Sequence, residues 1–218
     1  MTFKNWSFFV SIFLHMLLLN SIQTAYVISA IICGLLIIAL VAFLIFKNVY
    51  SPKHIRELTY FKLNSLCNTN DYLLLNNYRI HIDDSNIGSI DHIVISNKYI
   101  IIINDFSLSG VISGSAVSEK LKAYDKKGAN LIVNPLNYNI NLSKRLALFN
   151  DLSNGLIKGL VVIHNDSKIN LTNTSNQFKM IKLKDLKKTI KAFDKEPVKN
   201  LKEDDVVRFI NYLNSNNK

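Results

Sequence analysis

The sequence predicts an α/β fold in which helices flank a mixed sheet, preceded by an N-terminal transmembrane helical hairpin. The first observation behind this prediction is a stretch from Trp6 to Phe46 that contains no Lys, Arg, Asp or Glu. The second is a series of short runs rich in isoleucine and valine, which are typical of buried strands. The third is helical spacing of apolar residues before, between and after those runs. This alternation indicates a sheet covered by helices.

The hairpin prediction begins with Ala25–Phe46, which reads AYVISAIICGLLIIALVAFLIF. This length fits the roughly 20 apolar residues that cross about 30 Å of hydrocarbon. A soluble core helix that is apolar on every face would be unusual. The shorter apolar run Trp6–Leu19 predicts a first helix at about residues 5–20, and the uncharged segment Asn20–Thr24 is the turn between the two. Residues 1–50 are therefore expected to form a membrane anchor.

The charges around the hairpin predict its orientation. Lys4 precedes the first apolar segment, and Lys47, Lys53 and Arg56 follow the second. Because basic flanks stay on the cytoplasmic side, we expect both ends in the cytoplasm and the soluble domain at the inner face of the cell membrane. A cleaved signal peptide is the alternative, disfavoured by the missing A-x-A-like site and the second apolar run. A first segment that lies in the membrane interface is a further alternative.

Beyond the anchor, the chain has the size of one ordinary domain. We expect this domain at residues 51–196, with a C-terminal helix at residues 197–218. The 218-residue chain has 26 basic and 16 acidic residues, a net charge of +10, and almost all of this charge follows Lys47. Such a domain is suited to polyanions, either nucleic acid or anionic lipid. The alternative is a solvated surface in a chain rich in lysine.

The two cysteines indicate a reducing compartment. Cys33 lies inside the apolar segment, and Cys67 lies in the first part of the domain. A disulfide between them would require one sulfur atom to leave the lipid. The sequence contains no CxxC pair and no spacing typical of a metal finger.

The first half of the domain predicts one helix followed by strands. Pro52 fits a helix start, and apolar spacing predicts a helix over His54–Cys67. Asn68–Asp71 is expected to be a turn, and Tyr72–Leu75 and Tyr78–Ile82 are expected to be short strands.

The clearest strand signal follows in the middle of the chain. We expect strands at Ile90–Ile95 and Tyr99–Ile103, and the second of them, apolar on both faces, should be central in the sheet. A third strand is expected around Val111–Ser113. The lysine-rich segment Glu119–Gly128 is expected to be an exposed connection.

The last third of the chain predicts helices around two further strands. In order, we expect a helix from Pro135 to about Leu152, a buried strand at Leu160–His164, an edge strand at Gln177–Ile181, and amphipathic helices at Leu183–Phe193 and Glu203–Leu213.

Several short motifs carry a resemblance to a known family. They are Arg56-Glu57 on the first helix, the strand Ile90–Ile95, Ser109-Gly110 with Gly114, Asn134-Pro135 at a helix start, and the strand Gly159–His164. In order and spacing, from about Glu57 to His164, they resemble the nuclease-related domain, NERD. That family is related to the PD-(D/E)xK nucleases and is often joined to transmembrane segments. The resemblance therefore implies a restriction-endonuclease-like fold.

The resemblance also implies a set of site positions. In such nucleases an aspartate and a glutamate on neighbouring strands hold Mg²⁺, and a lysine two residues after the glutamate faces the same side. Asp91 matches the aspartate, and Glu57 matches the family's helix glutamate. Asn104 stands at the glutamate position, Phe106 at the lysine position and Tyr138 at the position of the family's glutamine.

These replacements predict a degenerate site with little or no nuclease activity. Asn104 offers a neutral oxygen without charge, and Phe106 neither donates nor accepts a hydrogen bond. Asp105 is acidic, but strand alternation directs it to the opposite face unless a bulge intervenes. Asp91 therefore remains as a lone metal candidate, and Mg²⁺ is expected only if the site is active.

Two further assignments concern residues near this site. A lysine from elsewhere, either Lys98 or one within Lys120–Lys127, could in principle replace the missing ammonium. His92, next to Asp91, is interpreted as a structural histidine rather than a catalyst.

A lysine-rich helix face is the remaining candidate for binding. It comprises Lys184, Lys187, Lys188 and Lys191, which could contact phosphates or anionic lipid headgroups, or could simply be solvated. Aromatic residues do not alternate with these lysines, so single-strand binding is not specifically indicated. Three functions follow as hypotheses: an inactive, membrane-tethered domain that binds nucleic acid or a protein associated with it; an active Mg²⁺-dependent nuclease with displaced residues; and a membrane-associated protein-interaction module.

Overall fold

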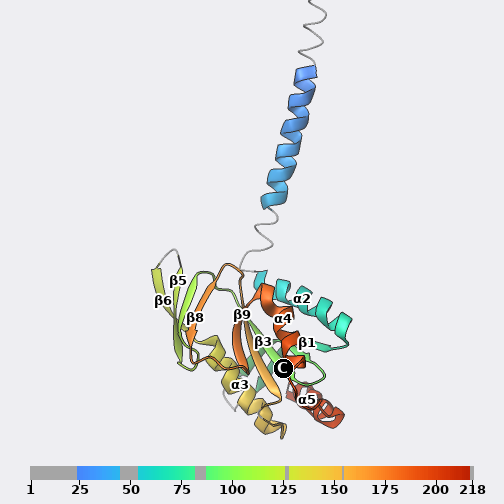
Figure 1. The fold of residues 1–218 in the computed structure, drawn as a ribbon, viewed down its shortest axis with the longest axis vertical. Helices are drawn as coiled ribbons and strands as arrows, with labels where there is room; N and C mark the ends of the chain where they lie inside the picture. Colours follow the sequence, from blue (N-terminus) through green and yellow to red (C-terminus); the bar gives the residue numbers. More distant parts are fainter. Residues whose placement is uncertain (1–23, 45–53, 82–86, 126–127, 154, 217–218) are drawn as a thin grey trace, which may run out of the picture. The chain divides into compact units, whose positions relative to one another are not determined.

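The computed structural model describes residues 24–44, 54–81, 87–125, 128–153 and 155–216. The chain divides into two compact units, Met1–Val49 and Tyr50–Lys218, and each is described by itself. In the described part of the first unit, Thr24–Leu44 is one continuous helix, drawn in blue in Figure 1. It is long enough and apolar enough to cross a membrane, although a signal sequence has the same properties. The predicted first helix at residues 5–20 lies outside the described residues, so the described part shows one candidate span.

The second unit is built on a mixed five-stranded sheet, with strand order β1-β2-β3-β7-β9. The first three strands are antiparallel, whereas β3, β7 and β9 run parallel. The central position predicted for the YIIII strand is confirmed, because β3 is third of five. The strands are β1 (Leu73–His81), β2 (Ile87–Ile95), β3 (Ile100–Phe106), β7 (Ile157–Ile163) and β9 (Phe178–Lys182).

Helices cover both faces of this sheet, as the sequence predicts. Side chains alternate along a strand, so Ile101 of β3 packs under α2 (Ile55–Asn70) and α4 (Leu186–Asp194), while Ile102 packs under α3 (Pro135–Phe149) and α5 (Glu203–Asn216). A short 3₁₀ turn, η2 (Leu183–Asp185), leads into α4. Figure 1 shows α2 and α4 side by side over the sheet.

A second sheet, of four strands, was not predicted. Its order is β6-β5-β4-β8, with β4 (Val111–Ser115), β5 (Lys120–Asp125), β6 (Gly128–Val133) and β8 (Lys168–Thr172). The prediction of an exposed segment over Glu119–Gly128 holds only in part, because Lys120 and Lys122 are exposed but belong to strand β5. Leu121 and Ala123 alternate with the lysines and are buried, so the segment pairs as a strand with one apolar face.

The Asn134-Pro135 motif joins the second sheet to α3. The Asn134 side chain accepts a hydrogen bond from the Leu136 amide at 3.0 Å, which caps the helix, and Pro135 fits the first helical turn. The Asn134 amide group also donates to the carbonyls of Ala116 and Ser118, at 2.9 and 2.7 Å. One buried side chain therefore fixes both the start of α3 and the β4–β5 turn.

Several boundaries differ from the prediction, and the following three lie near the candidate site. The two short strands predicted between Tyr72 and Ile82 form the single strand β1, in which Asn77 has a φ of 60°. The pairs Asn76–His92 and Tyr78–Ile90 flank this residue in the β1–β2 ladder. β3 extends to Phe106 and so carries all three positions from 104 to 106 as strand residues. The first helix continues to Asn70, where Asp71 in the left-handed region ends it.

Candidate functional site

The carboxylate of Asp91 is engaged on both oxygens. Arg56 of α2 places Nη2 2.6 Å from Asp91 Oδ1. The backbone amide of Asp105 donates to Asp91 Oδ2 at 2.8 Å. The Asp91 side chain is mostly buried and the Arg56 side chain is half exposed, so the pair lies at the surface end of the β2–β3 ladder. A fixed guanidinium therefore neutralises this carboxylate.

Asn104 and Tyr138 meet at the backbone of one residue, Ser89. The Asn104 amide donates to the Ser89 carbonyl at 3.0 Å, and its Oδ1 atom is buried without a hydrogen-bond partner among the described residues. The Tyr138 hydroxyl accepts from the Ser89 amide at 2.8 Å and donates to its carbonyl at 3.3 Å. Phe106 packs against the apolar cluster that contains Ile163. These contacts hold strand β2 in place and present no charge.

Asp105 points to the other face, toward α2. Its Oδ1 atom lies 2.6 Å from the Thr59 hydroxyl, and its Oδ2 atom lies 2.9 Å from His92 Nε2. On its other side, His92 Nδ1 lies 2.6 Å from Asn76 Oδ1. Both ring nitrogens of the buried His92 therefore contact protein groups, which leaves neither of them to act on a substrate.

Burial raises the pKa of Asp105, while the hydrogen bonds from His92 and Thr59 oppose that shift and the charge of Asp91 adds to it. A proton that Asp105 keeps lies within hydrogen-bonding distance of His92 Nε2. A neutral carboxyl group at Asp105 suits this dry position.

Glu57 lies in a hollow of about 390 Å³ beside α2, lined by Arg56, Glu57, Tyr60, Phe61, Asn76, Asn77 and His92, which we call the α2 hollow. Asp91 lies in a second hollow of about 340 Å³, lined by Arg56, Asn77, Tyr78, Arg79, Ser89, Ile90 and Asp91, which we call the β2 hollow. Arg56 and Asn77 line both hollows, so the two are adjacent. Glu57 and Asp91 are not brought into one hollow, and no described lysine lines either of them.

The donor groups present do not fit a Mg²⁺ site. Magnesium prefers several hard anionic oxygens in octahedral geometry. Here one oxygen of Asp91 faces a guanidinium, and the amide of Asn104 is turned to a backbone carbonyl. Over the described residues, no group of three or more His, Cys, Asp or Glu side chains could hold a metal ion. Among the described lysines considered as replacements, Lys98 donates to the Glu196 carbonyl at 2.6 Å, and Lys120 and Lys122 lie on β5. Lys126 and Lys127 lie outside the described residues.

The comparison with family models identifies the domain. The model of the nuclease-related domain matches residues 53–164, slightly more than half of the chain. The chain belongs to the NERD family. No curated protein and no solved structure matched it. The NERD match runs from α2 to the end of β7, so η2, α4 and α5 lie beyond the matched residues.

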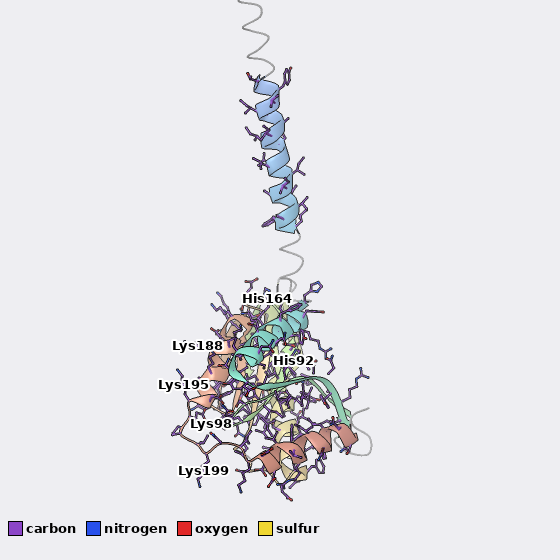
Figure 2. The ribbon with its side chains drawn as sticks, turned by 90° about the vertical axis from the view of Figure 1, so that its right-hand side faces the viewer. His92, Lys98, His164, Lys188, Lys195 and Lys199 are labelled. Atoms are coloured by element: carbon purple, nitrogen blue, oxygen red, sulfur yellow. The ribbon has the colours of Figure 1, made fainter. Side chains whose placement is uncertain are left out.

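The candidate lysines of this NERD protein lie on η2 and α4. Lys184, Lys188 and Lys191 are exposed, and Lys195 continues their stripe after the helix. Figure 2 shows Lys188 and Lys195 along one edge of the view. Lys187 turns toward α2, where its Nζ atom donates to Ser65 Oγ at 2.9 Å. The lysine face of α4, defined as Lys184, Lys187, Lys188, Lys191 and Lys195, therefore borders α2.

Lys62 of α2 belongs to the same basic surface, although the sequence did not single it out. Its Nζ atom donates to the Leu183 carbonyl at 3.1 Å. Burial lowers the pKa of Lys62, the charge of Lys187 lowers it further, and Asp185 opposes the shift. An anion that binds beside these two ammonium groups would relieve their repulsion.

Other residues of the site were also missed by sequence reasoning. The family motif does not predict that Arg56 pairs with Asp91. Thr59 and Asn76 come from different elements, and only the pairing of β1, β2 and β3 under α2 joins them to His92 and Asp105. The one available signal in the sequence is the four-residue spacing of Arg56 and Tyr60, which predicts that both lie on the same face of the helix.

Proposed function

We propose that this NERD domain binds nucleic acid without cleaving it, while the N-terminal helix tethers it to the cytoplasmic face of the cell membrane. The observation that carries the proposal is the Arg56–Asp91 ion pair. A metal-dependent nuclease needs a cation that polarises the phosphoryl oxygen and activates water. In this chain the guanidinium supplies positive charge at the same carboxylate but has no coordination position for a water molecule.

A guanidinium remains well suited to phosphate. It presents its N–H donors in a planar fork that matches phosphate oxygens, and it stays charged at all physiological pH values. Arg79 lines the same β2 hollow as Arg56 and Asp91. Arg56 is half exposed and contacts Asp91 through Nη2, so other N–H groups of its guanidinium can donate to a phosphate, which supports retained binding after the loss of cleavage.

The lysine face of α4 supports a nonspecific contribution. Lysines contact phosphates as point charges, and each contact releases counterions, so the affinity falls as salt rises. The net charge of +10 acts in the same direction. The basic residues Lys47 and Lys53, which follow the apolar helix, support the cytoplasmic orientation through the positive-inside rule.

The test uses the full chain in detergent micelles with fluorescein-labelled oligonucleotides, single-stranded and duplex, in anisotropy titrations over a range of salt. A cleavage assay with Mg²⁺ and with Mn²⁺ runs on the same samples. We expect salt-dependent binding and no cleavage above that of a mock preparation. Metal-dependent cleavage that Asp91→Ala abolishes would instead establish an active nuclease with displaced residues. Absence of binding at low salt would favour a protein-interaction module.

A further inference from the structure

Two aromatic rings of α2 line the α2 hollow and remain open to solvent. Phe61 is 66% exposed and Tyr60 is 39% exposed. Their centroids are 5.7 Å apart and their planes are tilted by 58°. A hollow of about 390 Å³ falls within the range of small-ligand sites, roughly 300–1,000 Å³. Aromatic rings at such a site offer a stacking surface for a planar ligand, because every nucleobase has a π face.

The polar lining of the α2 hollow suits the edge of a base. Asn76 directs Oδ1 to His92, so its amide N–H donors remain for a ligand. Asn77 is exposed and lines both hollows. Its φ of 60° differs from that of a regular strand, and it has no partner in the β1–β2 ladder. Glu57, which is also exposed, adds an acceptor. These groups match the donors and acceptors of a base, whereas the Glu57 carboxylate would repel a phosphate.

The β2 hollow differs in the donors that it offers. Arg56 and Arg79 line it, and the half-exposed Arg56 contacts Asp91 through Nη2. Other N–H groups of the Arg56 guanidinium can therefore donate to a phosphate in this hollow. Because Arg56 and Asn77 line both hollows, a base in one and its phosphate in the other need no long connection.

Phe61 of the α2 hollow lies one helical turn from a residue that contacts the lysine face. Phe61 and Ser65 are four residues apart on α2 and so lie on the same side of that helix. Ser65 accepts a hydrogen bond from Lys187. A strand whose backbone follows α4 would therefore reach the ridge of α2 that carries Phe61.

We propose that the α2 and β2 hollows together hold one unpaired nucleotide, with its base on Phe61 and Tyr60 and its phosphate against the Arg56 guanidinium. The nucleotide must be unpaired because a base within a duplex is stacked and its edge is paired. Binding of a nucleotide within a strand rests on the proposed function. The same chemistry also fits a free nucleotide, and the experiment separates the two sources.

The test compares three probes on the full chain in detergent: labelled oligothymidylate, a labelled duplex and thymidine monophosphate. We expect Phe61→Leu to weaken oligothymidylate binding about tenfold, since stacking on one aromatic ring contributes about that much, and to leave duplex binding within about twofold. Phe61→Tyr keeps a ring and should retain the affinity. Phe149→Leu is the matched control, because Phe149 is another exposed helical phenylalanine, 53% exposed and stacked on Tyr212.

Each outcome separates this proposal from the proposed function. Unchanged oligothymidylate binding by Phe61→Leu, with binding otherwise intact, overturns the nucleotide site and leaves the proposed function standing. Binding of thymidine monophosphate that Phe61→Leu abolishes, without binding of either oligonucleotide, supports the site and rejects the proposed function. No binding of any of the three probes overturns both.

Discussion

Arg56 on α2 and Asp91 on β2 form an ion pair with 2.6 Å between Nη2 and Oδ1, and this pair joins the first helix of the NERD domain to its central sheet. The pair fixes a cation at the carboxylate of Asp91, and neither Asn104 nor Phe106 adds a charge beside it. Under the proposed function, phosphate binding and phosphate cleavage are separable, and this separation underlies the first prediction.

Removing the guanidinium should weaken binding without creating cleavage. Arg56→Met removes the donor that would hold a phosphate and leaves Asp91 mostly buried with one oxygen lacking its ionic partner. We expect oligonucleotide affinity to fall several-fold and the unfolding free energy to fall by about 1 kcal/mol, a modest value because Arg56 is half exposed. Anisotropy and chemical denaturation measure the two effects. Metal-dependent cleavage by Arg56→Met would show that the ion pair, and not the degenerate ligand set, prevents nuclease activity.

The lysine face should determine the salt dependence of binding. Lys184→Ala, Lys188→Ala and Lys191→Ala combined should reduce the slope of log affinity against log salt by up to about 3, roughly 1 for each phosphate that a lysine no longer neutralises. The matched control is the pair Lys120→Ala and Lys122→Ala on β5, which removes lysines from the second sheet. An equal reduction of the slope in the control would mean that overall charge, and not this face, governs binding.

The buried His92–Asp105 pair should contribute to stability through its hydrogen bonds. Asp105→Ala leaves His92 Nε2 without a partner and opens a void, so we expect a loss of about 3 kcal/mol. Asp105→Asn keeps the shape and can donate to a neutral His92, so its loss should be much smaller. Thermal and urea unfolding measure both variants, and an equal loss in the two would contradict the assignment.

The pH dependence of that pair has a definite sign. The folded pKa of Asp105 lies above the ordinary value of 3.8, so the folded state holds a proton that the unfolded state releases. Its contribution to stability is fully present below pH 3.8 and is lost as pH rises through the folded pKa. The stability of wild type relative to Asp105→Asn should therefore decrease with rising pH above about 4. A difference that increases with pH would refute the raised pKa.

Lys158, Tyr99 and Glu196 form a second cluster, which holds the segment after α4 against the sheet. Its contribution to stability should depend on pH in the opposite direction. Lys158 Nζ lies 3.0 Å from Glu196 Oε2 and 4.3 Å from the Tyr99 ring centroid, and its side chain is only 8% exposed. Burial favours a higher pKa for Glu196, but hydrogen bonds from Tyr99 and Lys158 and the charges of Lys158 and Lys179 outweigh it, so the pKa is lowered. This contribution to stability is present above pH 4.5 and is lost as pH falls through the folded pKa.

Replacing the carboxylate of this cluster should be costly. Glu196→Gln leaves the Lys158 ammonium buried without its charged partner, and we expect a loss of about 2 kcal/mol at neutral pH that shrinks on acidification. Glu119→Gln, at an exposed side chain before β5, is the control.

Burial and the Glu196 hydrogen bond raise the pKa of Tyr99 to about 12, so the stabilisation by its neutral form should persist to about pH 10 and decline above it. Urea unfolding across the pH range tests both the loss of stability in acid, through Glu196, and the loss in alkali, through Tyr99.

Gly159 should tolerate no side chain. A Cβ atom at this residue of β7 would lie 2.5 Å from Cδ1 of Phe178 on the neighbouring strand β9. We expect Gly159→Ala to cost about 1–3 kcal/mol through overpacking. Gly155→Ala is the control, since the nearest atom to its Cβ would be Ser153 Oγ at 3.9 Å. Equal stability of the two variants would show that the Phe178 ring moves freely.

Sequence reasoning succeeded where a segment is buried on both faces. The first four residues of β3, 100–103, and the last four of β7, 160–163, are apolar runs without charges, and such runs give the same strand prediction in any context. It failed on β5, where Leu121 and Ala123 alternate with lysines. The lysines make this segment polar overall, so its short apolar face does not stand out in the sequence. That face becomes buried only when β5 pairs with β4 and β6.

The sequence alone determined the apolar N-terminal helix, the order of the main strands and helices, the family, and the replacement of charged groups at positions 104 and 106, because these depend on residue type and local spacing. Only the tertiary structure decided which groups meet: Arg56 with Asp91, Asp105 with His92, and Ser65 of α2 with Lys187 of α4. Such contacts join residues from separate elements. Strand register and helix packing bring these residues together, and no local pattern encodes their distances.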